Sequence, residues 1–127
     1  REHGPELACV LVDPMPNRAG LAPADQTYLE ALRQVTREVG ALLIFDEVIT
    51  FRLGYRGAQG FWNIAPHLTT LGKINGGGFP VGAICGHKDI MAGFQPVPDN
   101  TAVPPGRACS GWACSRDSRP ASLRRVP

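Results

Sequence analysis

Two residues of opposite charge, Asp46 and Lys73, stand where the sequence could do chemistry. Asp46 directly follows the apolar run of residues 41–45, and Lys73 lies between a second apolar run, Leu68–Leu71, and the three glycines of residues 76–78. A lysine in a partly apolar pocket can attack an aldehyde and form a Schiff base. Glycines beside it let the backbone approach a flat ligand closely. The sequence therefore predicts a carboxylate–amine site that could hold a flat aldehyde.

One cofactor uses both of these groups. Pyridoxal phosphate binds as an imine to a lysine, while an acidic residue keeps its ring nitrogen protonated. The protonated ring stabilises the carbanion left when a substrate amino acid or amine loses its α-proton, and the freed lysine amine carries that proton. A buried structural ion pair between Asp46 and Lys73 explains the same residues equally well. Composition and periodicity do not decide between these two hypotheses.

The elements that must position the pair begin with a strand, a helix and a second strand. Residues 7–12 and 41–45 are short apolar runs, which are typical of strands buried on both faces in a parallel sheet. Asp25 is a suitable helix N-cap and Gly40 a suitable C-terminal stop. Between them lies an apolar stripe with steps of three and four residues: Leu29, Leu32, Val35 and Val39. This order predicts a βαβ unit with parallel strands.

Residues 48–94 are predicted to form two further strands and a short helix. A long loop with a single turn of helix is expected from Val48 to His67, followed by strands at Leu68–Leu71 and residues 79–85 and a short helix at residues 89–94. The fold class is therefore α/β. In open α/β sheets, ligands bind outside the carboxyl ends of the strands. Asp46 and Lys73 are expected to meet at this edge.

Composition limits the function classes. The 127 residues are enough for one modest domain; 43% are hydrophobic and 19% are charged, as in soluble globular proteins. No apolar run reaches the roughly 20 residues that a membrane helix needs. The net charge of +2 comes from residues 95–127, which hold five arginines against two aspartates. No basic residues are patterned on a face that would bind nucleic acid.

The cysteines argue against a disulfide framework or a zinc site. Cys9 and Cys85 lie within apolar runs and are expected to be buried in the core. Cys109 and Cys114 are near no histidine in the sequence, so they do not form a zinc-ligand pattern. A reducing cytoplasm is the default localisation.

Several other polar and aromatic residues have more ordinary interpretations. A phosphate-loop motif would need glycine at position 67 and serine or threonine at 74, where His67 and Ile74 stand. His67 is expected to pack rather than to bind a ligand. The aromatic residues Trp62, Phe61 and Phe51 could line a pocket, with core packing the preferred interpretation.

Three charged residues lie near Asp46 in the sequence: Arg52, Arg56 and Glu47. Arg52 and Arg56 could meet a substrate carboxylate, but structural or solvent-exposed pairing explains them equally well. Glu47 is a candidate for orienting the neighbouring backbone near a cofactor.

Two longer motifs carry a family resemblance. "ALLIFDEVITFRLGYRGAQG" (residues 41–60) and "PHLTTLGKINGGGFPVGA" (residues 66–83) resemble class-III, pyridoxal-phosphate-dependent aminotransferases, in the glutamate-1-semialdehyde 2,1-aminomutase-like branch. The resemblance implies a mostly parallel sheet with flanking helices, which is part of a fold-type-I large domain. It also implies site roles: Asp46 on the pyridine nitrogen, Val48 packed on the cofactor ring, and Lys73 as the Schiff-base lysine.

The same resemblance implies a function. We expect a fragment of an enzyme that transfers amino groups, either a transaminase (a transferase) or an aminomutase (an isomerase), with pyridoxal 5'-phosphate as cofactor. Its substrates would be small amino acids, amines or oxo acids. The full-length family implies a cytoplasmic homodimer without nucleic-acid or membrane partners. The alternative is a truncated, non-catalytic remnant that does not bind cofactor.

Departures from the family pattern define the expected limits of the domain. The loop after Asp46 lacks a glycine that is common before Phe51, and Asn75 replaces a common aliphatic residue. Residues 1–94 are expected to be a fragment of the large domain without its phosphate-binding segment. Residues 95–127, rich in Pro, Arg and Ser, are expected to be disordered or translated out of frame. The chain alone is therefore expected to be poorly stable and inactive.

Overall fold

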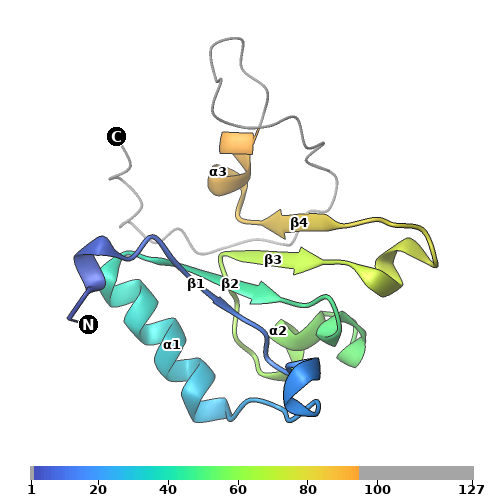
Figure 1. Ribbon diagram of the computed structural model, residues 1–127. Helices are drawn as coiled ribbons and strands as arrows, with labels where there is room; N and C mark the ends of the chain where they lie inside the picture. Colours follow the sequence, from blue (N-terminus) through green and yellow to red (C-terminus); the bar gives the residue numbers. More distant parts are fainter. Residues whose placement is uncertain (1, 95–127) are drawn as a thin grey trace.

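The computed structural model describes residues 2–94, which contain one four-stranded sheet (Figure 1). Its strands are β1 (Cys9–Val12), β2 (Leu42–Asp46), β3 (Leu68–Leu71) and β4 (Ala83–Gly86), in that spatial order. β1 pairs with β2 and β2 with β3 in parallel, whereas β3 and β4 are antiparallel. The predicted α/β class with a mostly parallel sheet is confirmed.

The helix between β1 and β2 has the predicted ends. α1 (Gln26–Val39) begins after Asp25, whose Oδ1 accepts hydrogen bonds from the backbone N–H groups of Thr27 and Tyr28 at 2.8 and 3.3 Å. It ends at Gly40, which takes a left-handed φ of 75° that costs glycine little. The N-cap and C-terminal stop signals are therefore both confirmed.

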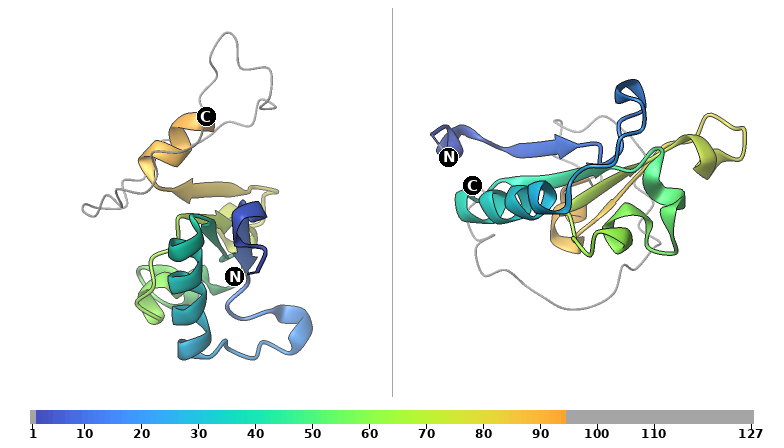
Figure 2. Two further views of the ribbon diagram at one scale, coloured as in Figure 1. Left: turned by 90° about the vertical axis from the view of Figure 1, so that its left-hand side faces the viewer. Right: turned by 90° about the horizontal axis from the view of Figure 1, so that it is seen from below.

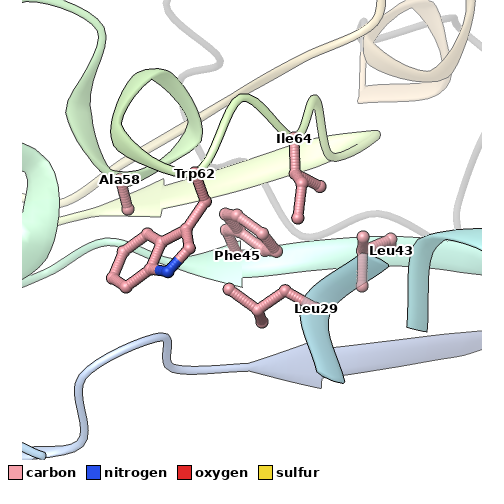
Figure 3. Close-up of a cluster of buried hydrophobic side chains, with 6 residues drawn as sticks. All are labelled: Leu29, Leu43, Phe45, Ala58, Trp62 and Ile64. Carbon is pink, nitrogen blue, oxygen red and sulfur yellow. The ribbon is translucent and has the colours of Figure 1, made fainter. Parts of the chain in front are cut away.

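A hydrophobic cluster joins the sheet to the helices on one face. Figures 1 and 2 show α1 and the short α2 (Gly57–Phe61) on the same side of the strands. Side chains from β2, α1 and the α2 region meet there (Figure 3): Leu29, Leu43, Phe45, Ala58, Trp62 and Ile64. The core interpretation of Trp62 is confirmed, whereas Phe61 is 66% exposed. The single turn of helix expected in this loop corresponds to α2, which follows a 3₁₀ turn at Thr50–Leu53.

The opposite face of the sheet corrects two predictions. Because side chains alternate along a strand, Leu11 of β1 points away from the core, and it is 62% exposed. The prediction that β1 is buried on both faces was therefore wrong. Among the described residues, α1 and α2 cover only one face of the sheet. Cys9 is exposed and Cys85 only half-buried, so the prediction that both are core residues was also wrong.

The last strand begins later than expected, and the last helix is shorter. The strand predicted for residues 79–85 is confined to Ala83–Gly86, and Phe79 lies before it with 75% of its surface exposed. The left-handed Gly77 and Gly78, with φ of 55° and 103°, extend the preceding turn and delay pairing. The helix predicted at residues 89–94 is α3 (Lys88–Met91) followed by a 3₁₀ turn, Ala92–Phe94. The predictions for residues 95–127, the cysteine pair included, lie outside the described residues.

His67 connects the strands at the start of β3. Its Nδ1 accepts the Leu43 backbone N–H at 2.7 Å, and its own N–H donates to the Leu43 carbonyl at 2.8 Å. His67 O accepts the His87 N–H at 3.0 Å, which extends the connection toward β4. Arg33 Nη1 lies 3.2 Å from Nδ1. Burial, and then the positive charge of Arg33, lower the pKa of His67 to about 4. The predicted packing role fits this arrangement.

The neutral form of His67 makes stability depend on pH. Its folded-state pKa of about 4 lies below the ordinary 6.5, so protons bind the unfolded chain more readily. Its contribution is complete above about pH 6.5 and is lost as the pH falls toward about 4. We expect His67→Gln, which does not titrate, to reduce this pH dependence. Urea midpoints measured between these pH values test this, and parallel curves for the two proteins would contradict it.

Phe45 should contribute far more stability than Phe79, because its side chain is fully buried in the cluster. We expect Phe45→Ala to lower the free energy of unfolding by about 3–5 kcal/mol. The matched control is Phe79→Ala, which removes the same group from an exposed position and should change it by less than about 0.5 kcal/mol. Urea unfolding followed by circular dichroism measures both. Equal losses would contradict the assignment of the core.

Candidate functional site

The sheet brings Asp46 and the segment around Lys73 to one edge. β2 and β3 are parallel neighbours, with Asp46 of β2 paired in register with Thr70 of β3. Asp46 is the last residue of β2, β3 ends at Leu71, and Lys73 begins the 3₁₀ turn Lys73–Gly76. The arrowheads of β2 and β3 in Figure 1 point toward this same edge. The expected meeting of the two strand ends is therefore present in the backbone.

Asp46 is half-buried and is oriented through one of its two carboxylate oxygens. Oδ1 accepts the Val48 backbone N–H at 3.1 Å and the Thr70 hydroxyl at 3.3 Å. Within residues 2–94, Oδ2 accepts no hydrogen bond. The carboxylate is thus held in place while one oxygen remains available to a donor from outside the described chain.

Lys73 has an unusual backbone conformation. Its φ is +46°, in the left-handed region that non-glycine residues enter at an energetic cost. The side chain is exposed, and among the described residues Nζ forms no hydrogen bond or ion pair. A buried ion pair with Asp46, one of the two hypotheses from sequence, is therefore not what these residues form. The amine is therefore accessible from solvent and, among the described residues, unpaired.

Val48 lies between the acid and the lysine turn. Its backbone N–H binds Asp46, while its side chain packs against Gly72, where an added Cβ would lie 3.3 Å from Val48 Cγ2. Gly72 directly precedes Lys73. Asp46, Val48, Thr70, Gly72 and Lys73 therefore form one continuous group, which we call the strand-end site.

The groups at the strand-end site suit a flat, polar-ended ring. An unoccupied carboxylate oxygen offers an acceptor, the Val48 side chain offers an apolar surface, and the Lys73 amine offers a nucleophile. These are the groups that a pyridine ring bearing an aldehyde requires. Thr70 was missed by sequence reasoning. Its only signal is a polar residue within an apolar strand, and its meaning depends on the register with Asp46.

Glu47 faces the other side of the strand from Asp46 and is fully buried. Its carboxylate accepts the backbone N–H of Ala58 at 2.6 Å and that of Gln59 at 3.4 Å. Burial raises the pKa of Glu47, while these hydrogen bonds oppose the shift. Glu47 orients the neighbouring backbone of α2, while its predicted place near a cofactor stays a prediction.

The remaining candidates lie apart from these contacts. Arg52 and Arg56 are exposed, and within residues 2–94 neither forms an ion pair, so a substrate role for them stays a prediction. The described part of the chain contains no group of three or more side chains arranged to bind a metal ion. It also contains no helix that is long and apolar enough to span a membrane.

Curated relatives match most of this chain. The glutamate-1-semialdehyde 2,1-aminomutase of Limosilactobacillus reuteri is 52% identical over 99 residues, covering 77% of the chain and 23% of the relative. That of Caldivirga maquilingensis is 54% identical over 97 residues, covering 76% and 23%. The chain thus spans under a quarter of the length of these relatives.

Solved structures agree with this match. An omega-transaminase from Sphaerobacter thermophilus is 49% identical with a TM-score of 0.71, covering 82% of this chain and 23% of that one. A transaminase with PLP bound is 42% identical with a TM-score of 0.75, covering 82% and 24%. A glutamate-1-semialdehyde aminomutase from Pseudomonas aeruginosa, in complex with PMP, is 30% identical with a TM-score of 0.63, covering 69% and 19%.

The family comparison covers both strand ends of the site. The model of aminotransferase class-III matches residues 1–102, which include Asp46, Val48 and Lys73. This match extends over most of the chain, and the relatives and structures above agree with it. The chain belongs to the class-III aminotransferase family.

Proposed function

We propose that this chain supplies the acid and the lysine of a pyridoxal-phosphate-dependent enzyme that moves amino groups. The observation that supports this most is the strand-end site itself. At one sheet edge, Val48 lies beside Asp46 and next to the turn of Lys73, and neither Asp46 Oδ2 nor the Lys73 amine has a partner within residues 2–94. The names of the relatives favour an aminomutase, and the names of several structural neighbours favour a transaminase.

When bound, the cofactor supplies a ring that withdraws electrons from the substrate α-carbon. Asp46 would hold a proton at the ring nitrogen through Oδ2, because Thr70 and the Val48 N–H fix Oδ1. An ionised carboxylate at that nitrogen forms a charge-assisted hydrogen bond. Val48 would cover one face of the ring with its side chain.

Lys73 would act twice. Its amine is the point of covalent attachment for the cofactor aldehyde carbon. With cofactor and substrate bound, the same nitrogen would accept the proton from the substrate α-carbon as a general base and return a proton as a general acid. The left-handed φ of 46° at Lys73 sets the direction in which its side chain leaves the backbone.

The finer parts of the function follow from the same proposal. The substrate class is a small amino acid, amine or oxo acid, and the whole enzyme is a cytoplasmic homodimer. A remnant that does not bind cofactor is the second candidate, because the Lys73 side chain is exposed rather than enclosed in an apolar pocket. Cofactor attachment distinguishes the two.

Covalent attachment should be confined to Lys73. The sequence contains only one other lysine, the exposed Lys88 on α3, which is a natural control. After incubation with pyridoxal phosphate and borohydride reduction, we expect peptide mapping to find the adduct on Lys73. Lys73→Ala should abolish it and Lys88→Ala should not. Equal labelling of both lysines, or none, would support the remnant.

Asp46 should matter for the chemistry more than for attachment. We expect Asp46→Asn to keep labelling of Lys73 while slowing exchange of an amino acid's α-proton with deuterated water. The loss should be about 10- to 100-fold, since a charge-assisted hydrogen bond contributes about 1.5–3 kcal/mol. Asp89→Asn, an exposed carboxylate on α3, is the matched control. Exchange measured by proton NMR that is unchanged in Asp46→Asn would contradict the role of Asp46.

A further inference from the structure

The neighbouring carboxylates Asp46 and Glu47 have opposite environments. Asp46 points away from the α-helices, where Oδ2 has no partner among the described residues. Glu47 points toward α2 and has no exposed surface. A buried carboxylate is costly unless hydrogen bonds replace its lost hydration. Because Glu47 lies directly beside Asp46, we ask whether its buried carboxylate has a role in the strand-end site.

Both oxygens of Glu47 accept hydrogen bonds. Oε2 accepts the Ala58 N–H at 2.6 Å, and Oε1 accepts the backbone N–H of Gln59 at 3.4 Å and its side-chain amide at 3.3 Å. The same Gln59 amide nitrogen lies 3.3 Å from the Thr69 hydroxyl oxygen and can donate to it. We call Glu47, Gln59 and Thr69 the carboxylate clamp. It connects the end of β2 to β3 through α2.

The backbone around the clamp is built to admit this carboxylate. A Cβ at Gly57 would lie 2.2 Å from Glu47 Oε2, and Gly57 has a φ of +65°. Glycine is therefore required there, both for space and for conformation. The arrangement also requires two acceptor oxygens, because the amide nitrogen of a glutamine would face either the Ala58 N–H or the Gln59 donors.

Two residues of the carboxylate clamp, Glu47 and Thr69, are the direct sequence neighbours of Asp46 and Thr70. Glu47 follows Asp46, Thr69 precedes Thr70, and the Glu47 N–H donates to the Thr70 carbonyl at 2.9 Å. Any shift between the ends of β2 and β3 would therefore move the Thr70 hydroxyl relative to Asp46 Oδ1. The clamp restrains that movement from the opposite face of the sheet.

We propose that Glu47 is a positioning residue of the strand-end site: through Gln59 and Thr69 it holds the ends of β2 and β3 so that Asp46 faces the cofactor ring nitrogen. This inference rests on the proposed function. Glu47 does not touch the cofactor, and it acts through Asp46. Loss of the clamp should therefore weaken the hold of Asp46 on the ring proton while leaving the Lys73 amine able to attach.

The test is to load the full 127-residue chain with pyridoxal phosphate labelled with ¹⁵N in its ring. The ¹⁵N chemical shift reports whether the ring nitrogen is protonated, and borohydride trapping reports attachment to Lys73. We expect Glu47→Gln to keep attachment and to lower the pH at which the ring nitrogen loses its proton by about one unit. Glu30→Gln is the control, because Glu30 is an exposed acceptor of the Gln26 amide on α1.

Thr69→Val provides a second, milder variant, since it removes one hydroxyl and keeps the shape of a buried side chain. It should shift the ring-nitrogen titration in the same direction by a smaller amount, and it carries the test if Glu47→Gln does not fold. Folded variants with an unchanged titration would overturn the inference and leave the proposed function standing. An unsubstituted chain that takes no cofactor on Lys73 would overturn both.

Discussion

The parallel pairing of β2 with β3 is the constraint on which the rest of this structure depends. Its register sets Asp46 opposite Thr70 and brings the turn that carries Lys73 to the same sheet edge. The same pairing places Phe45 in the core that α1 and α2 cover. A shared hydrogen-bond ladder thus fixes both the hydrophobic cluster and the chemical groups beyond its end. His67, at the other end of β3, anchors the ladder through its contacts with Leu43.

The local parts of the fold could be predicted from sequence because their causes are local. Asp25 and Gly40 bound α1 through capping hydrogen bonds and a left-handed φ, which need only adjacent residues. The α/β class followed from apolar runs and helical periodicity. Exposure of Cys9 could not be predicted, since an apolar run does not specify which of its faces will be covered.

Only part of the candidate site could be predicted from the sequence. Asp46, Val48 and Lys73 were proposed from two spaced motifs, and the structure adds the contacts of Val48 with Asp46 and with Gly72, the residue before Lys73. Thr70 and the carboxylate clamp were beyond reach because they depend on register between segments far apart in the chain. The acidic pair in the first motif gave no indication that its two members have separate environments.

Phe45, Asp46 and Glu47 alternate between the two faces of the sheet, and this alternation also favours the correct register of β2. A shift of this strand by a single position would turn the Phe45 ring toward water and drive the Asp46 carboxylate among the apolar side chains of the cluster. Glu47 would at the same time lose the hydrogen bonds that it accepts from Ala58 and Gln59. Misaligned pairings of β2 therefore carry a charge penalty as well as a packing defect, so Asp46 and Glu47 also help to select the correct register of this strand.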